Sequence, residues 1–423
     1  GNYNTVVGDE AGTALTTGDN NVAIGYKALK TEDAHGTNVA VGTEALETLN
    51  AGGEGYNVAV GYKASEAETT GIENTMVGAF AGGLGTTASR AVGLGYSALY
   101  RQNPDSLTAT YNIAIGYNTG SNVTTGHENT LIGGLAGDAL TTGSNNVAVG
   151  YQALSTEDGH GDNTAVGYRA LLTQNVGADG YNTAVGSNAG KDITTGRKNV
   201  LMGSYTGQPL TDADFNTAIG YASLSADTLG SRSTAIGHGA LSSQNFTSAT
   251  DTNNTAVGYN AGIALTTGVN NTLIGALAGD GITSGDRNTA VGYLALSGAV
   301  DDGLRNTCVG ASAGLLTTGD QNTFVGAYDP STGGSGEAMT TGSKNTILGS
   351  FNGNQANLDI RTSSNNVVIS DGDGNPHYHI DSNAEHNIYR GTNTSNNNIV
   401  TFRSNVNGVR NGLCNIQADG DIF

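Results

Sequence analysis

A five-residue motif recurs along almost the whole chain, and its spacing constrains the fold more than any other feature. The motif consists of Asn, a β-branched residue, a variable residue, an aliphatic residue and Gly. It begins at positions 4, 21, 38, 57, 74, 91, 112, 129, 146, 163, 182, 199, 216, 233, 254, 271, 288, 306, 322, 345 and 366, and most steps are 17 residues. Short fixed periods of this kind are typical of repeat proteins, whose units stack on their neighbours.

The first part of each unit has the pattern of a short β-strand. The residues one and three after the Asn are β-branched or aliphatic, as in Val22 and Ile24, and they share one face of a strand. The residue between them, often Ala as in Ala148 and Ala256, points to the other face. Because both faces are largely apolar, we expect burial on both sides of the strand.

The second part of each unit is less regular but still repetitive. A small residue such as Ala28 lies seven positions after the anchor, and Leu or Gly follows it. Many units then contain Thr-Thr-Gly, as at 16–18, and we expect a positive φ at this Gly. The second part therefore predicts another short strand and a second Gly turn.

A unit of this size cannot bury its own apolar face, but stacked units can. Helices are disfavoured because Gly interrupts every possible helical run. We therefore predict an all-β fold, a β-solenoid of about 21 coils with a repeat of about 17 residues.

The Asn at the start of each unit is interpreted as a structural ladder. Asn tolerates turn conformations, and stacked amides can hydrogen-bond from one coil to the next. The ladder is formed by Asn4, Asn21, Asn38, Asn57, Asn74, Asn112, Asn129, Asn146, Asn163, Asn182, Asn199, Asn216, Asn254, Asn271 and Asn288, and continues at later anchors.

The repeats define two regions. Residues 1–370 form the repeat domain, and residues 371–423 form an irregular, β-rich cap or connector. Longer steps place inserted loops on one face of the solenoid. These loops are Thr48–Tyr56, Arg101–Tyr111, Thr173–Tyr181, Ser243–Asn253 and Tyr328–Met339. Since Gly1 is in phase with a turn Gly, we expect the chain to begin inside a coil and to continue upstream.

Composition excludes several classes of function. The chain has 66 Gly but only 4 Pro, so it is not collagen. The net charge of −20 argues against nucleic-acid binding, which needs a basic face. No apolar run is long enough to insert into a membrane. The two cysteines, Cys308 and Cys414, are expected to be free thiols.

Units such as Asn21–Leu29, Asn254–Gly268 and Asn271–Gly279 resemble the repeats of bacteriophage tail fibres of the marine and cyanobacterial type. They are similar, more distantly, to trimeric autotransporter adhesin heads. The end of the chain resembles the segment that precedes a self-cleaving chaperone in such fibres. The resemblance implies a parallel homotrimeric rod that is located on the virion and is extracellular. It also implies contacts with an upstream tail-attachment protein and with a glycan or protein of the host surface.

No catalytic residues are predicted. A glycan-cleaving fibre needs two carboxylates on either side of a sugar. The acidic pairs Glu32-Asp33, Glu157-Asp158, Asp212/Asp214 and Asp301-Asp302 are expected to be solvated loop charges. The Tyr five after the anchor, such as Tyr26 and Tyr151, is expected to cover a coil edge or a subunit interface, although it could stack on glycans.

One metal site is considered. His377 and His379 form a His-x-His pair on a predicted strand, so both imidazoles would share a face. In a trimer they could surround one axial ion, because imidazole suits Fe, Ni or Zn. Exposed histidines without a metal are the alternative. The run Asp371–Asn375 resembles a calcium loop but lacks the closing Glu. No other cofactor is predicted.

The function expected from the sequence is structural and adhesive: a rigid spacer and a receptor-binding element. Two alternatives are an adhesin head and, because Thr residues stack, an ice-binding solenoid. For trimer formation we expect the Ala column, including Ala148 and Ala256, to lie outside the single-chain coil. Receptor contacts are expected from the inserted loops and from residues 371–423.

Overall fold

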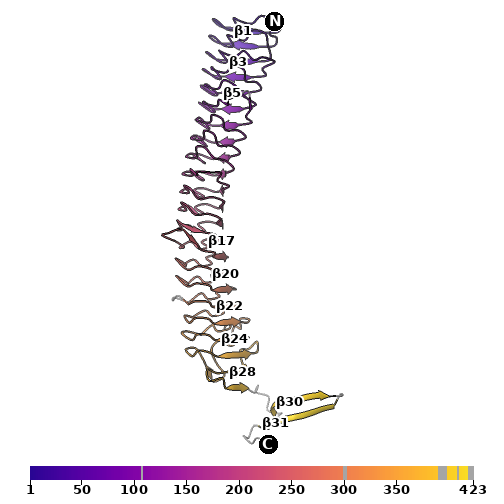
Figure 1. Ribbon diagram of the computed structural model, residues 1–423, viewed down its shortest axis with the longest axis vertical. Helices are drawn as coiled ribbons and strands as arrows, with labels where there is room; N and C mark the ends of the chain where they lie inside the picture. The colour runs from indigo at the N-terminus through magenta and orange to yellow at the C-terminus, as the bar shows by residue number, and fades with distance from the viewer. Residues whose placement is uncertain (106–107, 299–302, 389–397, 407–408, 418–423) are drawn as a thin grey trace. The chain divides into compact units, whose positions relative to one another are not determined.

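The computed structural model is a parallel β-solenoid with one short strand in most coils (Figure 1). It describes residues 1–423 except 106–107, 299–302, 389–397, 407–408 and 418–423. Contacts divide the chain into two compact units, one of Gly1–Ser233 with Asn245–Asp251 and one of Thr234–Gln244 with Thr252–Phe423. Within the described residues there is no helix.

The first unit contains a ladder of three-residue parallel strands. Partners are in register, so that Thr130, Leu131 and Ile132 pair with Val147, Ala148 and Val149. The strands are β1 (Thr5–Val7), β2 (Val22–Ile24), β3 (Val39–Val41), β4 (Val58–Val60), β5 (Thr75–Val77), β7 (Val92–Leu94), β9 (Ile113–Ile115), β10 (Thr130–Ile132), β11 (Val147–Val149), β12 (Thr164–Val166), β13 (Thr183–Val185), β14 (Val200–Met202) and β15 (Thr217–Ile219).

The second unit repeats this ladder and ends differently. Its parallel strands are β17 (Thr234–Ile236), β19 (Thr255–Val257), β20 (Thr272–Ile274), β21 (Thr289–Val291), β22 (Thr307–Val309), β23 (Thr323–Val325), β24 (Thr346–Leu348) and β27 (Val367–Ser370). After Ser370 the pairing becomes antiparallel, because β28 (Pro376–Ile380) pairs with β27 and β29 (His386–Ile388) pairs with β28. A separate hairpin joins β30 (Asn398–Val406) and β31 (Val409–Gln417).

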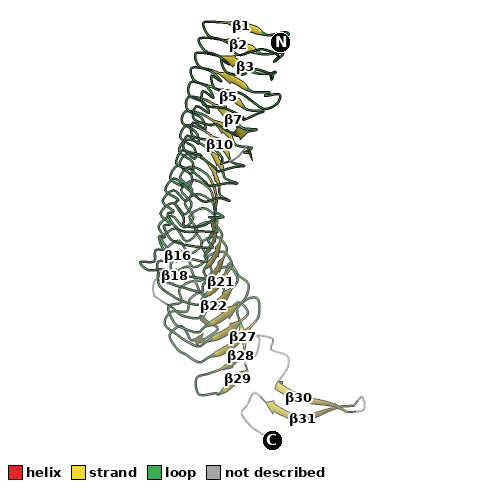
Figure 2. Ribbon diagram, turned by 45° about the horizontal axis from the view of Figure 1, so that its top comes forward, coloured by secondary structure: helices red, strands yellow, loops and turns green. Residues whose placement is uncertain are grey.

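Within the part of the chain that the structure describes, six two-residue strands lie outside these ladders. In the first unit β6 (Ala88–Ser89) pairs in parallel with β8 (Thr108–Ala109), and β16 (Gly230–Ser231) with β18 (Thr250–Asp251). In the second unit β25 (Asn354–Gln355) and β26 (Leu358–Asp359) form an antiparallel pair. The remaining backbone consists of turns and loops, as Figure 2 shows in green. The prediction of a second strand in every coil is therefore wrong.

The two faces of the strands differ in burial, which corrects two predictions. The middle residue of each strand points into the coil: Ala148 and Ala256 are fully buried. The flanking residues point outward and are partly exposed, as at Ile132 and Ile274. Thus the strands are not buried on both sides within one chain, and the Ala column is the core rather than an outer face.

The core is narrow, and two positions share its volume. In one type of coil the middle strand residue is Ala and the residue six positions later is Leu, as with Ala148 and Leu154. In another type the middle residue is Leu and the later one is Gly, as with Leu131 and Gly137. A Cβ on Gly137 would lie 2.9 Å from Leu131 Cδ2, which is too close for a real contact. Small and large residues therefore alternate to fill the coil.

More residues of the turns adopt the left-handed backbone conformation than the sequence predicts. Many non-glycine residues have positive φ, including buried Leu29 at 48°. By contrast, Gly18 of the Thr-Thr-Gly turn does not have a positive φ, so that prediction is wrong. A Cβ on Gly18 would lie 2.3 Å from the carbonyl oxygen of His35 in the next coil. Glycine is needed there because two backbones approach closely.

The Asn column connects the backbone of each coil to the next. Asn129 Oδ1 accepts the backbone N–H of Asn146 at 3.0 Å, and Asn129 Nδ2 donates to the carbonyl of Gly143 at 2.9 Å. Amide-to-amide bonds also occur, for example from Asn129 Nδ2 to Asn112 Oδ1 at 3.1 Å. These anchors are buried, so the ladder satisfies backbone groups that water cannot reach.

Candidate functional site: the outer sheet face and the inserted loops

The outward face of the parallel strands is uncharged and made of Thr and aliphatic residues, although it is not covered. Its two columns consist of Thr, Val and Ile beside Val, Ile, Leu and Met, without any charged residue. In the first unit Val77, Ile115, Ile132 and Met202 belong to its exposed members. In the second unit Ile274, Val325, Leu348 and Ile369 belong to them. Parallel sheets normally have both faces covered, so this face has the character of an interface.

A column of tyrosines follows the strands, as the sequence predicts. Tyr26, Tyr62, Tyr117, Tyr151 and Tyr168 are each 40% to 58% exposed. Basic side chains lie over some of the rings: Lys27 Nζ is 5.1 Å from the centre of Tyr26, and Arg169 is 5.0 Å from that of Tyr168. These distances are typical of cation–π contacts. The rings therefore cover the coil edges only in part.

Four aromatic rings from successive coils form a continuous column in the first unit. Tyr62 and Phe80 have centroids 5.3 Å apart, Phe80 and Tyr96 5.7 Å, and Tyr96 and Tyr117 5.5 Å. The first two pairs meet edge to face and the last is stacked. Such pairs stabilise the stack of coils, and the three tyrosines remain exposed while Phe80 is partly buried.

Three inserted loops rest on buried carboxylates, which corrects the prediction that Glu32 and Glu157 are solvated. Both glutamates and Asp227 are fully buried, in a column that holds Leu, Ile or Val in many other coils and Gln in several. Each accepts a backbone N–H from the inserted loop of the next coil. The pairs are Ala51 to Glu32 at 3.1 Å, Val176 to Glu157 at 3.4 Å and Phe246 to Asp227 at 3.3 Å.

The inserted loop of 101–111 provides a natural comparison. Pro104 occupies the place in this loop that Ala51, Val176 and Phe246 occupy in the others, and Pro has no N–H to donate. The corresponding residue of the preceding coil is Gly85, which has no carboxylate. Among these four loops, a buried acid lies next to the three that offer an N–H and is missing next to the one that offers none. Glu68, in the same column, is a buried acid without an inserted loop in the next coil, and its Oε1 accepts the N–H of Gly71 in its own coil at 2.8 Å.

Two of these carboxylates have a histidine and an aspartate beside them. His35 Nδ1 lies 3.5 Å from Glu32 Oε1, and His160 Nδ1 lies 3.5 Å from Glu157 Oε1. Asp33 and Asp158 are the third members of these groups. Burial raises the pKa of Glu157, although hydrogen bonds from Gln174, Val176 and His160 oppose this effect.

A third acidic group has a different environment. Glu44, Glu47 and Glu66 are close enough to hold an ion. However, Lys63 Nζ lies 3.0 Å from Glu44 and 2.8 Å from Glu66, and Lys27 Nζ lies 3.4 Å from Glu47. The lysines already compensate these carboxylates, so this group is an ion-pair network.

The two predicted metal ligands in β28 occupy different environments. His377 is exposed, and its Nε2 lies 3.2 Å from Asp371 Oδ2. His379 is buried, and its Nε2 lies 3.0 Å from Asn366 Oδ1. The axial site in a trimer stays a prediction. Asp371 Oδ1 accepts the N–H groups of Asp373 and Asn375, which explains the loop without calcium.

The other candidates have structural partners or lie outside the description. Asp212 accepts a bond from Thr195 Oγ1 at 2.6 Å, and Asp214 accepts one from Arg197 N at 2.7 Å. Cys308 is free and fully buried in β22, and burial raises the pKa of its thiol to about 12. Asp301, Asp302 and the side chain of Cys414 lie outside the described residues.

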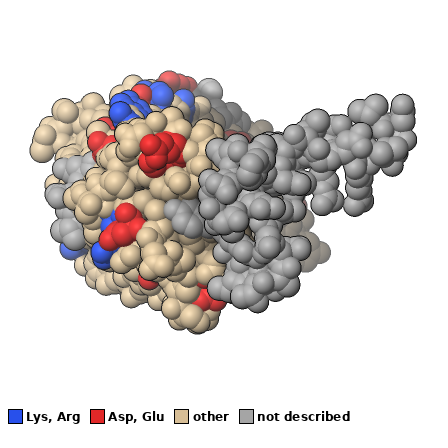
Figure 3. Space-filling model, turned by 90° about the horizontal axis from the view of Figure 1, so that it is seen from below, with Lys and Arg blue, Asp and Glu red and all other residues tan. Residues whose placement is uncertain are grey.

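Charged side chains are sparse on the surface. Figure 3 shows small separate acidic and basic groups on a mainly uncharged face, in agreement with the 13% of charged residues. Among the described residues, none belongs to a helix long and apolar enough to cross a lipid bilayer. No family model, curated protein or solved structure matches this chain.

Proposed function

We propose that this chain is a structural and adhesive protein that associates with copies of itself through the outer sheet face. The observation that carries the proposal is the uncharged apolar strand face, which is partly exposed in both units. An uncovered face of this kind is an association site in most soluble proteins. The resemblance of the repeats to phage tail fibres favours a trimer that acts as a spacer and contacts a host surface.

The chemistry of the face favours a second and third copy as its partners. Its residues repeat at each coil, with a spacing of about 4.8 Å between neighbouring strands. The surface that best matches such a repeat is another copy with the same spacing. Thr and Val columns can pack closely, because they are short and stiff at χ1.

Receptor contacts are assigned to the inserted loops rather than to the coils. The coil residues are occupied by stacking, whereas Thr48–Tyr56 and Thr173–Tyr181 are extra chain seated on buried acids. Several copies of each loop would then act together, so weak contacts to a glycan or protein would add up.

An ice-binding function has less support. Threonine hydroxyls of the turn column are used within the solenoid: Thr141 Oγ1 donates to Asp158 O at 2.7 Å, and Thr266 Oγ1 to Thr283 O at 2.9 Å. An adhesin head would share the coil geometry and remains the alternative of the same structural class.

Sedimentation equilibrium of the full chain tests self-association. We expect a trimer, and Ile132→Lys with Val149→Lys should shift the mass toward the monomer by burying charge in the interface. Thr142→Lys, at an exposed turn, is the matched control and should leave the mass unchanged. A monomeric wild-type chain would refute the proposal. Binding of labelled chain to host cells, with and without the inserted loops, tests adhesion separately.

A further inference from the structure

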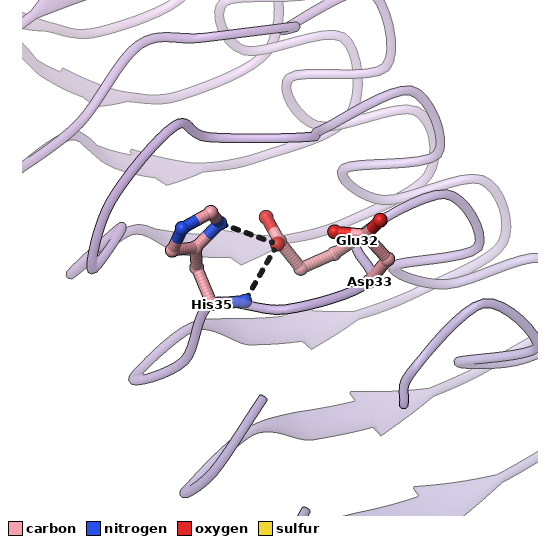
Figure 4. A group of neighbouring side chains, drawn as sticks. All are labelled: Glu32, Asp33 and His35. Atoms are coloured by element: carbon pink, nitrogen blue, oxygen red, sulfur yellow. Dashed lines mark hydrogen bonds and ion pairs between the residues drawn. The ribbon is translucent and has the colours of Figure 1, made fainter. Parts of the chain in front are cut away.

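The group of Glu32, Asp33 and His35 brings three potential ligands to one turn (Figure 4). The Glu32 side chain is buried and its Oε1 accepts the backbone N–H of His35 at 3.1 Å. His35 Nδ1 points at the same oxygen from 3.5 Å. One nitrogen and two carboxylate oxygens, one from each residue, all lie within 4.8 Å of one another.

The same group occurs a second time in the chain. Glu157 is buried, its Oε1 accepts the N–H of His160 at 3.2 Å, and His160 Nδ1 is 3.5 Å away. Asp158 supplies the third ligand, again within 4.8 Å. Both groups lie directly below an inserted loop, and both loops donate an N–H to the glutamate.

The two histidine nitrogens are the observation that points to a ligand. Nδ1 of His35 and Nδ1 of His160 are both buried and have no hydrogen-bond partner. Their separation of 3.5 Å from the carboxylate oxygen is too long for a good hydrogen bond. It is close to the edge of a zinc tetrahedron, roughly 3.4 Å for bond lengths of about 2.1 Å.

The charges also suit a divalent ion. Two carboxylates and a neutral imidazole carry a formal charge that balances one dication. The carboxylates of Asp33 and Asp158 have no hydrogen bond or ion pair within the described part of the chain, so they are available as ligands. The lysine-compensated group of Glu44, Glu47 and Glu66 lacks both features.

We propose that each of these two groups binds one divalent transition-metal ion of the zinc class, through the histidine Nδ1 and the two neighbouring carboxylates. A mixed nitrogen and oxygen set suits zinc better than magnesium or calcium, which prefer oxygen alone. Three protein ligands leave one position for water. Because the same glutamate accepts the loop N–H, the ion fixes the carboxylate that holds Thr48–Tyr56 or Thr173–Tyr181 in place.

Calorimetric titration of the full chain with zinc chloride at neutral pH tests the proposal. His35→Gln should remove one bound ion, and His35→Gln with His160→Gln should remove two, whatever other ions the chain binds. His127→Gln is the matched control, because His127 is exposed and lies 3.6 Å from Glu128 without a third ligand. It should leave the number of ions unchanged.

Circular dichroism and thermal unfolding keep the result interpretable. Each variant should retain the wild-type spectrum, since the changed side chains are partly exposed, at 30% and 33%. Zinc should raise the unfolding temperature of the wild type more than that of the double variant. Equal zinc binding by the wild type and the double variant would overturn the proposal. Binding of magnesium with the same affinity as zinc would also overturn it. So would a wild-type chain that binds no zinc, because each histidine would then only pair with its glutamate.

Discussion

The backbone N–H of Ala51 donates a 3.1 Å hydrogen bond to the buried carboxylate of Glu32, which lies in the preceding coil. The bond joins an inserted loop to the core of the solenoid. Glu32→Gln should loosen this loop, because an amide offers only one acceptor oxygen and leaves one N–H unpaired, at a cost of about 1–3 kcal/mol. Hydrogen exchange at Ala51 measures the effect. Asp9→Asn, at an exposed position of another coil, should not change it, and unchanged protection in Glu32→Gln would contradict the assigned role.

The buried acid Glu68 predicts a pH dependence of stability. Burial raises the pKa of Glu68 to about 8, although bonds from the backbone N–H groups of Gly71 and Thr69 oppose this. Between the ordinary carboxyl pKa and 8 the native state therefore holds a proton that the unfolded chain has released. The contribution of Glu68 to stability decreases as pH rises through this range, by up to about 1.4 kcal/mol per pH unit.

Glu68→Gln removes the titrating group and is the test of this dependence. The unfolding temperature of the wild type should fall more between pH 5.5 and 8 than that of Glu68→Gln. Other carboxyls also contribute, so the difference between the two curves is the quantity to measure. Parallel curves would show that Glu68 does not titrate in this range.

The Asn ladder predicts a large effect of one amide. Asn129→Ala removes the acceptor for the N–H of Asn146 and the donor to Gly143 O, and both groups stay buried. We expect a loss of roughly 2–4 kcal/mol from two unsatisfied groups. Chemical denaturation measures it, with Thr142→Ala as the control at an exposed turn. A loss no larger than that of the control would contradict the ladder.

The Asn ladder can also be tested by adding an Asn where one coil lacks it. Ala91 replaces the Asn of one coil, and its N–H is accepted by Asn74 Oδ1 at 3.0 Å. Ala91→Asn supplies a new acceptor for the next anchor, Asn112, and should stabilise the chain by about 1 kcal/mol. The unfolding temperature of Ala91→Asn should therefore rise, whereas Ala34→Asn, at an exposed turn, should have no such effect. A lower unfolding temperature of Ala91→Asn would mean that the coil has no room for the amide.

Two glycines can show whether the glycine requirement comes from close contact between neighbouring backbones or from the backbone conformation. A Cβ on Gly126 would lie 2.4 Å from Gly143 O in the next coil, whereas nothing lies within 4 Å of a Cβ on Gly177. Neither glycine has a positive φ in the left-handed range. Gly126→Ala should destabilise by about 1–3 kcal/mol and Gly177→Ala should be nearly neutral. Equal thermal stability of the two variants would exclude the steric explanation.

The period, the strand positions and the burial of the Asn column follow from the sequence, because identical residues in register reveal which positions stack. The direction of the strand faces does not follow. Ala148 and the Val residues beside it are all apolar, and the inward position also holds large residues such as Leu131 and Phe324, so neither hydrophobicity nor size marks it. Hydrophobicity alone cannot distinguish a core from an uncovered face.

The burial of the acids could also not be predicted from the sequence of a single repeat. Glu32 and Glu157 lie in a Thr-Glu-Asp run that looks like a solvated turn. Their burial depends on an N–H from the following coil, a contact between residues 19 positions apart. Aligning the coils by their anchors would have indicated it, since the same column holds Leu or Ile in many other coils and the coil after Glu32 and after Glu157 carries an insertion.

The shared volume of the core limits how the repeats can be rearranged. Leu131 fills space left by Gly137 in its own coil and by Gly120 in the coil before, where an added Cβ would lie 2.7 Å from Leu131 Cδ1. The same sequence of coils recurs at Gly190, Leu201 and Gly207. A coil with Leu in the middle therefore requires a suitable predecessor. A change in the number of repeats that keeps this packing has to carry such a coil together with its predecessor, so we expect coils to be gained or lost in sets rather than singly.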